Sequence, residues 1–579
     1  MRAVAALLLV LAACGRRNFD PYPADGGPGF GVPDGGFVPA MCAPGEWCWQ
    51  NPLPIGVHWY AVGGSGVDVW TVGDAGYALH WDGATYTVER AATTILRAVW
   101  VGPNNDVRAV GDGGVIVRRV GGSWATETSP VTANLTGVHG AGINDVWAVD
   151  DTGAILHYDG NGWSVMFTAT GPLRGVWASS ATDVWTVGDF GLAIHYDGSF
   201  RTEQTRTMAN IEAVWGSGPT DVFAVSAGAI LHYDGARWNV TGPAITTIGS
   251  TALGGTGPTR VAVHKANSLY ELEGTTWTET AWPSNINGIY GDPSGALWQV
   301  GDCGVVDRRD PAGAWGAVLP IPRSGTIYSK WHAPDGAWWV TSGRFILRKG
   351  VGDVRWSTVH EDAQGVATIW GMDATDLWVG HQFDGTILHY DGFSWTPFST
   401  ALTGGITDID GMSSTEVWAT GMYGAVRWNG ASWTSVSVPA STSYGVLVFG
   451  PQDVWAGSSS TTPGLWHYNG SWTNAVPSGH AYEFDGVGVD QWAGGGNGIF
   501  SWDGSTWVQR DTTNAYSISV VSPTDVWASL AGYATVRHFD GSTWQTSNAA
   551  PGAHINQVWA TPTEVSIGGE CGQILTLSR

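Results

Sequence analysis

The chain of 579 residues is longer than a single hydrophobic core usually grows, so we expect more than one folded unit. Hydrophobic residues make up 43% of it and charged residues 13%, and its 36 tryptophans outnumber its 26 lysines and arginines. This composition indicates a globular protein with extensive aromatic packing. The formal net charge of -24 argues against binding to nucleic acid or to an anionic membrane surface, since both select basic patches.

Residues 1–14, MRAVAALLLVLAAC, combine one arginine, a short apolar run and small residues, which predicts a signal peptide rather than a membrane span. The end of this segment resembles the lipobox of bacterial lipoproteins, in which the cysteine becomes the lipidated first residue. That resemblance implies lipidation of Cys14. Gly15 follows in place of aspartate, which implies sorting to the outer membrane of a Gram-negative bacterium.

Residues 15–41 are rich in Gly, Pro and Asp and have no apolar period, which predicts a disordered tether. No later apolar segment is long enough for a membrane helix. We therefore expect a protein that is anchored by a lipid at the outer membrane, facing either the periplasm or the cell exterior.

The body of the chain is a repeat of about 38 residues, such as "DVWTVGDFGLAIHYDGSF" at 183–200. Each unit predicts four short strands, here 173–179, 183–189, 192–198 and a segment that begins at Phe200. Asp-Gly and Asn-Gly pairs supply the tight hairpin before the fourth strand. Four strands with this period predict the blades of an all-β propeller. The fourteen units are marked by equivalent second-strand residues: Trp70, Arg108, Trp147, Trp185, Phe223, Ala262, Trp298, Trp339, Trp378, Trp418, Trp455, Trp492, Trp527 and Ser566.

Fourteen blades exceed the usual four to eight in one ring, so we expect tandem propellers, with two rings of seven favoured over eight plus six. Cys303 and Cys571 occupy the same turn seven units apart, which supports seven and seven. The expected domains are 42–313 and 314–579. The orphan segment "GEWCWQNPLP" at 45–54 is expected to complete unit seven, and the strand at Trp315 to complete unit fourteen, so that neither ring keeps an open edge.

The "DVWxVG" and "HYDGxxW" repeats resemble bacterial propellers of the BNR or Asp-box kind, in the variant common among myxobacterial-type surface lipoproteins. The resemblance covers nearly everything from residue 44 onward. The segment "SWDGSTW" at 501–507 approaches the Asp-box, but Gly504 follows Asp503 directly, so the box is one residue short. Sialidase-type propellers also have an Arg-Ile-Pro opening and this chain has none. Fold similarity alone does not carry activity.

Three residue types recur in the blades, and we assign all three a structural role. The second-strand tryptophans are expected in the core, between neighbouring blades. The acids that precede them are expected to bond to their own turn backbone. The third-strand histidines are expected to pack, because one per blade does not converge on a metal. The acids are Asp68, Asp106, Asp145, Asp183, Asp221, Asp376, Asp453 and Asp525; the histidines are His80, His157, His195, His232, His389, His467 and His538.

One acidic position is not uniform along the chain. The turn after the second strand carries an aspartate in five units of the first ring, whereas most units of the second ring lack it. Five carboxylates on one face could bind a divalent cation such as Ca²⁺ or a basic partner. The alternative is five solvated turn residues. These candidate site residues are Asp74, Asp112, Asp151, Asp189 and Asp302.

Four cysteines remain after lipidation: Cys42, Cys48, Cys303 and Cys571. An exported protein can hold disulfides, and three pairings are possible. We favour Cys42 with Cys48 and Cys303 with Cys571.

These observations together predict a lipid-anchored envelope protein that is not an enzyme and has no required cofactor. Its propellers would serve as a scaffold for protein or surface-ligand binding in adhesion or assembly. The alternatives are a glycan-binding lectin and a BNR-type glycoside hydrolase. For a lectin, Trp49 and Trp282 are the candidate aromatic residues outside the repeat positions.

Overall fold

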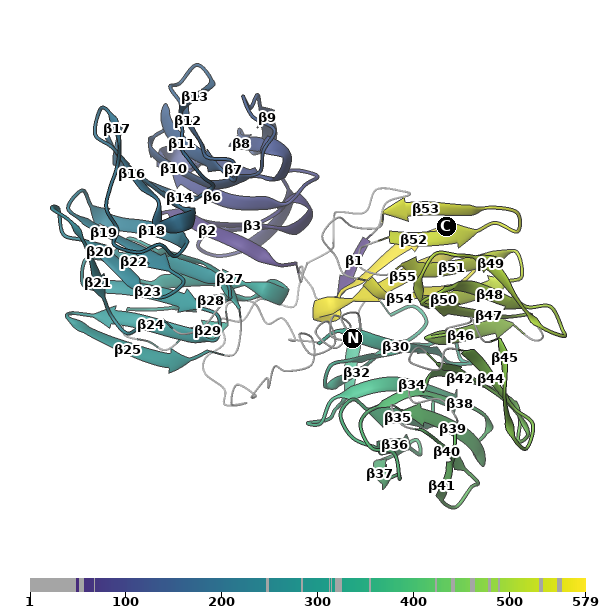
Figure 1. The fold of residues 1–579 in the computed structure, drawn as a ribbon. Coiled ribbons are helices and arrows are strands. Elements are labelled where there is room, and N and C mark those ends of the chain that lie inside the picture. Colours follow the sequence, from purple (N-terminus) through teal and green to yellow (C-terminus); the bar gives the residue numbers. More distant parts are fainter. Residues whose placement is uncertain are drawn as a thin grey trace. The chain divides into compact units, whose positions relative to one another are not determined.

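The computed structural model describes residues 48–51, 57–66, 68–245, 249–282, 285–311, 313, 315–317, 325–353, 356–421, 424–438, 443–458, 464–476, 481–487, 490–530, 535–548 and 555–579. Strands and short 3₁₀ turns make up the regular structure of this part of the chain (Figure 1). The strands form fourteen four-stranded antiparallel sheets within the described residues. The protein is therefore an all-β propeller protein, as the repeat predicts. The predicted signal peptide, the tether, Cys14 and Cys42 lie outside the described residues.

The first propeller holds seven sheets, each with its strands in sequence order from the axis outward. Their bounds are β2 Trp59–Ser65, β3 Asp68–Gly73, β4 Tyr77–Trp81, β5 Tyr86–Arg90; β6 Leu96–Gly102, β7 Asp106–Gly111, β8 Ile116–Val120, β9 Ser123–Glu127; β10 Leu135–Gly142, β11 Asp145–Asp150, β12 Ala154–Tyr158, β13 Trp163–Thr168; β14 Leu173–Ser180, β15 Asp183–Gly188, β16 Ala193–Tyr196, β17 Phe200–Thr202; β18 Ile211–Gly218, β19 Asp221–Ser226, β20 Ile230–Tyr233, β21 Trp238–Thr241; β22 Thr251–Gly257, β23 Arg260–Lys265, β24 Ser268–Glu273, β25 Thr276–Ala281; and β26 Ile286–Gly291, β27 Leu297–Gly301, β28 Val306–Arg309, β29 Trp315–Ala317.

The second propeller has the same plan, except that the outer strand of its last blade is β1. Its strands are β30 Ile327–His332, β31 Trp338–Ser342, β32 Phe345–Lys349, β33 Ser357–Glu361; β34 Val366–Asp373, β35 Asp376–His381, β36 Thr386–Tyr390, β37 Trp395–Ser399; β38 Ile406–Ser413, β39 Glu416–Gly421, β40 Gly424–Trp428, β41 Trp433–Val436; β42 Ser443–Gly450, β43 Asp453–Ser458, β44 Gly464–Tyr468, β45 Trp472–Val476; β46 Glu483–Val487, β47 Asp490–Gly495, β48 Gly498–Trp502, β49 Trp507–Asp511; β50 Ala515–Ser522, β51 Asp525–Leu530, β52 Thr535–Phe539, β53 Trp544–Asn548; and β54 Ile555–Ala560, β55 Glu564–Gly569, β56 Ile574–Ser578, with β1 Cys48–Asn51.

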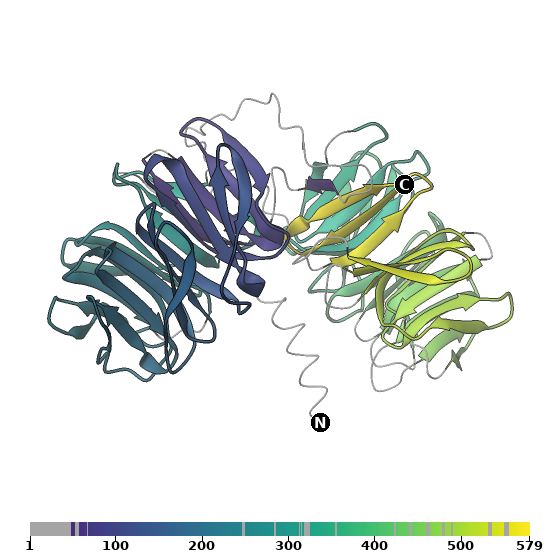
Figure 2. The same ribbon diagram turned by 90° about the horizontal axis from the view of Figure 1, so that it is seen from above.

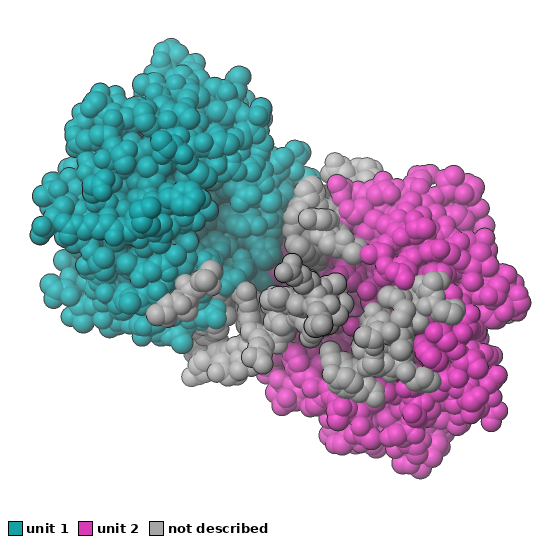
Figure 3. Space-filling model, viewed as in Figure 1, with its two compact units in different colours: residues 1–36, 57–320 teal, residues 37–56, 321–579 magenta. Residues whose placement is uncertain are grey.

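The innermost strands contact one another in sequence and close each ring: β2 meets β26 in the first propeller and β30 meets β54 in the second (Figure 2). The compact units are 57–320 and 321–579, the second joined by 37–56 (Figure 3).

The closing strand of the second propeller corrects the sequence prediction. β1 pairs antiparallel with β56, with Cys48 opposite Thr576, so the N-terminal strand completes the last blade rather than unit seven (Figure 1). The strand at Trp315 stays in its own blade, where Trp315 pairs with Arg309. The short connection from β28 favours this local hairpin, because closing a short loop loses little entropy. The first propeller is therefore inserted in the chain between β1 and the rest of the second propeller.

The recurrent tryptophans form the core, as predicted. Trp70, Trp147, Trp185, Trp378 and Trp418 are almost completely buried between blades. Full burial of such side chains is among the largest favourable contributions to the stability of each blade.

The repeated aspartate, histidine and tryptophan form one cross-strand unit. In the third blade His157 lies opposite Trp147 and stacks on it with ring centroids 4.2 Å apart, while its Nε2 lies 2.6 Å from Asp145 Oδ1. The prediction that these acids bond to their own turn backbone is wrong, because an acid two residues before the tryptophan lies on the same sheet face as the histidine. The same pair recurs as Asp68–His80, Asp183–His195, Asp221–His232, Asp376–His389, Asp453–His467 and Asp525–His538.

A variant of this unit supports the structural assignment. In the β38–β41 blade the acid is Glu416 and the histidine position is Arg427, whose guanidinium lies 5.8 Å from the centre of the Trp418 ring. Arg427 donates two hydrogen bonds to Glu416, at 2.7 and 2.6 Å. Acid and base have changed together while the stacking on tryptophan is kept, which is typical of a packing unit rather than of catalytic machinery.

Candidate functional site

The five predicted site aspartates lie in the turns between the second and third strands at one end of the first propeller. Four of them open 3₁₀ turns: η1 Asp74–Gly76, η3 Asp112–Gly114, η4 Asp189–Gly191 and η5 Asp302–Gly304. Asp151 lies in the corresponding turn after β11. We call this end of the ring the D-x-G end.

Each of these carboxylates is bonded to a residue at or just before the innermost strand of its own blade. Arg97 pairs with Asp112 and Arg174 with Asp189, each with an Nη2–Oδ2 distance of 3.1 Å. The other partners are Tyr60 for Asp74 at 2.9 Å, Asn134 for Asp151 at 2.9 Å, and Asn285 and Asn287 for Asp302 at 2.7 and 3.0 Å. The carboxylates are distributed around the ring and do not gather into one uncompensated cluster. Among the described residues, no group of three or more His, Cys, Asp or Glu is placed to hold a metal ion.

Two of the five acids are brought together where the first ring closes. His58 donates its backbone N–H to Asp74 Oδ2 at 3.1 Å, and its Nδ1 lies 2.9 Å from Asp302 Oδ1. Burial raises the pKa of Asp74, and this effect outweighs the opposing influence of His58 and Tyr60. Burial also acts to raise the pKa of Asp302, but the His58 pair and the two asparagine hydrogen bonds lower it to about 2.

A lysine completes the D-x-G end where the acidic turn is missing. The buried Lys265 donates from Nζ to Thr251 Oγ1 at 2.7 Å and to the Gly249 carbonyl at 3.1 Å, and it forms an ion pair with Glu212. The sequence analysis did not identify Lys265 as a candidate residue. Its position at the end of a second strand, where other blades reach the acidic turn, was the available signal.

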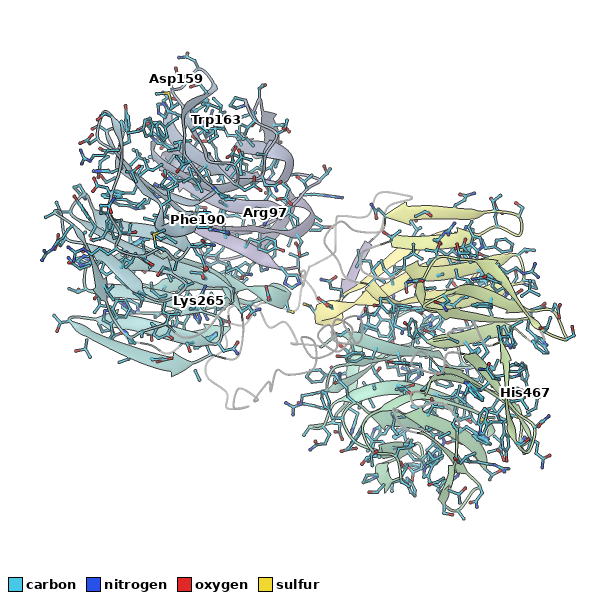
Figure 4. The ribbon with its side chains drawn as sticks, viewed as in Figure 1. Arg97, Asp159, Trp163, Phe190, Lys265 and His467 are labelled. Atoms are coloured by element: carbon cyan, nitrogen blue, oxygen red, sulfur yellow. The ribbon has the colours of Figure 1, made fainter. Side chains whose placement is uncertain are left out.

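One side chain at the D-x-G end is prominently exposed. Phe190, in the middle of the η4 turn, has φ of 59° and is 70% exposed, and its N–H donates to Asn210 Oδ1 at 3.1 Å (Figure 4). Met208 is 80% exposed and follows Thr207, whose carbonyl lies against the Gly191 of the same turn. The end of this blade therefore presents an aromatic and a methionine beside the Arg174–Asp189 ion pair.

A second polar cluster, which the sequence analysis missed, lies on the innermost strands of the second propeller. Lys330 Nζ forms an ion pair with Glu483 and donates to Ser517 Oγ at 3.1 Å and to Gln557 Oε1 at 3.2 Å. Because these residues belong to four different blades, Lys330 ties β30 to β46, β50 and β54.

A further innermost strand of this ring, β38, also carries acids near the axis. Asp408 and Asp410 on β38 accept backbone N–H groups from Val446 at 2.8 Å and Val448 at 2.7 Å on the next blade. Burial raises the pKa of Asp408 and raises that of Asp410 to about 7. An alignment of first strands would have pointed to these residues, because "ITDIDG" has acids where "LTGVHG" has glycine and histidine.

Burial raises the pKa of Glu483 and of Asp485 as well, although the charge of Lys330 opposes both shifts. Asp485 accepts the Val520 N–H at 2.8 Å. Among the residues that the structure describes, four carboxyl groups and one lysine therefore gather near the axis of the second propeller. We call these five residues, Lys330, Asp408, Asp410, Glu483 and Asp485, the axial cluster.

The remaining candidates are placed as follows. Trp282 packs edge-on against His264 and Trp315, with ring centroids 5.5 and 6.0 Å apart, so it is part of the first propeller's core. The side chain of Trp49 lies outside the described residues. Cys303 and Cys571 occupy equivalent turns, each with φ near 60°; their pairing with each other stays a prediction. Among the described residues, no helix is long and apolar enough to cross a membrane.

Comparison with known proteins supports the fold. No family of known proteins matches the sequence, and neither does any curated protein. PorZ, a bacterial surface component of the type-IX secretion system of Porphyromonas gingivalis, is 12% identical and has a TM-score of 0.63 over 92% of this chain and 87% of its own. An ancestral GH74 enzyme is 12% identical, with a TM-score of 0.64 over 92% of this chain and 99% of its own. At such identity the likeness establishes the β-propeller fold alone.

Proposed function

We propose that this protein is a non-catalytic binding protein of the bacterial envelope, anchored at the outer membrane by a lipid on Cys14. Its contact surface is the D-x-G end of the first propeller. The surface location of PorZ is in keeping with an envelope site, and the short lipobox-like sequence supplies the anchor. The partner is a protein or a glycan at the cell surface.

The observation that carries this proposal is the conformation of Phe190. A bulky aromatic at positive φ costs free energy, and Ala75 and Gly113 occupy the same turn position in other blades, so the fold does not require it. Strained residues concentrate at functional sites. Aromatic residues, methionine and arginine are enriched at protein interfaces, and Phe190, Met208 and Arg174 supply one of each.

The carboxylates of the D-x-G end are poorly placed for hydrolysis. A glycoside hydrolase needs two accessible carboxyl groups, one of them protonated. Asp112 and Asp189 are held in ion pairs with arginine. Asp74 has the raised pKa of a general acid, but it is only 3% exposed and both of its oxygens are already bonded. Among the five described aspartates of the D-x-G end, Asp74 and Asp302 have pKa values shifted in opposite directions, so they are the residues to test for the enzymatic alternative.

The test compares two exposed phenylalanines. Phe190→Asn keeps a residue that tolerates the left-handed region, whereas Phe393→Asn removes a 96% exposed phenylalanine from a hairpin of the second propeller. Saturable binding of the soluble body to outer-membrane fractions should weaken on the order of tenfold for Phe190→Asn, as for an interface hot spot, and should not change for Phe393→Asn. Equal binding by all three proteins would remove the D-x-G end as the contact surface.

A second assay addresses catalysis. Incubation of the protein with a panel of polysaccharides should release no reducing sugar. Release that disappears in Asp74→Asn or Asp302→Asn would replace this proposal with a glycoside hydrolase.

A further inference from the structure

Three tyrosines form a cluster at the corresponding end of the second propeller. Tyr444, Tyr482 and Tyr516 stand at equivalent positions on three consecutive blades, each one residue before the inward position of the innermost strand, which holds Gly445, Glu483 and Ser517. The ring centroids of Tyr444 and Tyr482 are 5.4 Å apart and those of Tyr482 and Tyr516 are 5.8 Å apart. Tyr516 is 39% exposed, so the cluster reaches the solvent.

The tyrosines adjoin the axial cluster through the backbone. Tyr482 is followed directly by Glu483, Tyr516 by Ser517, and Tyr444 lies two residues before Val446, whose N–H is bound by Asp408. The described side chains of the axial cluster provide four carboxylates against the single ammonium of Lys330. An aromatic surface therefore borders a region that becomes net negative when these buried carboxyl groups ionise.

The propeller fold does not require this arrangement. In the first propeller the position of the tyrosines holds one tyrosine, Tyr60, and it holds Arg97 and Arg174 in two other blades, where each arginine is neutralised by an aspartate of its own turn. The seven described innermost strands of that ring carry one acid, Glu212, which is paired with Lys265, and they hold no aromatic cluster at this position. The tyrosines and acids of the second propeller are thus a local addition.

We propose that this end of the second propeller binds an organic cation, an ammonium or guanidinium group, against the tyrosine rings and beside the carboxylates of the axial cluster. The face of an aromatic ring carries partial negative charge and attracts a cation, most strongly where the cation leaves water. Nearby carboxylates add attraction over a longer range. Such a site distinguishes a cation from a neutral molecule of the same shape.

The protonation of the axial cluster gives this site a pH dependence. Burial raises the pKa of Asp408, Asp410, Glu483 and Asp485, and Lys330 is the one cation among them. A bound cation favours the ionised carboxylates, so its binding releases protons. The affinity should therefore increase from pH 6 to pH 8.

The first experiment is calorimetric titration of the full chain with choline and with its neutral isostere 3,3-dimethylbutan-1-ol. Choline should bind at least about tenfold more tightly than the isostere. A lysine tripeptide with blocked ends distinguishes the source of the cation: tighter binding than choline indicates a protein side chain, and weaker binding indicates a small amine. Equal affinity for choline and the isostere, or no binding of either cation, would overturn the proposal.

Variants locate the site. Tyr482→Ala should weaken choline binding on the order of tenfold, while Tyr482→Phe, which keeps the ring face, should stay within about threefold of the wild type. Phe393→Ala removes an exposed aromatic from the same propeller and should have no effect. Phe190→Asn should also leave choline binding unchanged, which separates this site from the surface on the first propeller. Equal loss in Tyr482→Phe and Tyr482→Ala would show that the hydroxyl, not the ring face, binds the ligand, and would overturn the proposal.

Discussion

The innermost strands of the two propellers differ at one inward position. In the first propeller the residue there is always alanine or glycine, whereas in the second it is polar or charged in six of seven blades. The residues are Ala61, Ala98, Gly137, Gly175, Ala213, Ala252 and Gly288 in the first, and Ser329, Thr368, Asp408, Glu483, Ser517 and Gln557 in the second, with Gly445 as the exception.

The difference reflects two ways of closing an axis. A Cβ added at Gly137 would lie 3.2 Å from the backbone nitrogen of Val176, so neighbouring strands of the first propeller approach too closely for a larger side chain. In the second propeller the side chains reach the next blade instead: Ser329 accepts the Ile369 N–H at 3.3 Å and Asp408 accepts the Val446 N–H at 2.8 Å. In the second propeller these side chains satisfy backbone N–H groups that the sheets leave unpaired. Charged residues occupy this inward position only in the second propeller.

The largest expected effect tests whether those charges hold the second ring together. Lys330→Met removes the ammonium and leaves Glu483 unpaired, which should destabilise the second propeller by about 3 kcal/mol, as for a broken buried ion pair. Hydrogen exchange measured by mass spectrometry in increasing denaturant separates residues 325–579 from 57–317. Lys349→Met in the same propeller is the control and should have little effect. A loss spread evenly over both propellers would contradict the comparison.

The next effect is the pH dependence of the second propeller. The pKa of Asp410 is raised to about 7 in the folded state, against about 3.9 for an unperturbed aspartate, so the folded state binds the proton more tightly. Stability should therefore fall as pH rises from 5 to 8, on the order of 2 kcal/mol. In the first propeller the pKa shifts of Asp74 and Asp302 have opposite directions and partly cancel. Asp410→Asn should flatten the pH dependence of the second propeller's denaturation midpoint; an unchanged slope would mean that Asp410 is ionised throughout this range.

The repeat predicted the strands, the number of strands per blade and the buried tryptophans, because period, turn residues and aromatic positions are local features of the sequence. It could not decide which strand closes which ring. The segments at Cys48 and Trp315 both fit a fourth strand, and the choice depends on the length of the connection and on pairing with β56, 525 or more residues away from Cys48 in sequence.

The candidate sites were less accessible to sequence reasoning than the fold. The five aspartates of the D-x-G end were found, but their partners on the innermost strands were not, because Arg97 and Asp112 are brought together only by the register of β6 and β7. Lys330 bonds to residues more than 150 positions away, on blades brought next to it only by ring closure. The positive φ of Phe190 could not be predicted from the sequence, since phenylalanine does not favour that conformation.

The smallest expected effect measures the strain at Phe190 and sharpens the contrast between the two propellers. Phe190→Gly relieves a left-handed aromatic, and this gain offsets the extra entropy that glycine has in the unfolded chain. Phe393→Gly brings the same entropy but relieves no such strain, since Phe393 is outside the set of residues at positive φ. The two substitutions should therefore differ by about 1 kcal/mol in their effect on the propeller that contains them, in favour of Phe190→Gly. Equal destabilisation by the two would mean that Phe190 is held without strain, and its exposure alone would then have to support the contact surface on the first propeller.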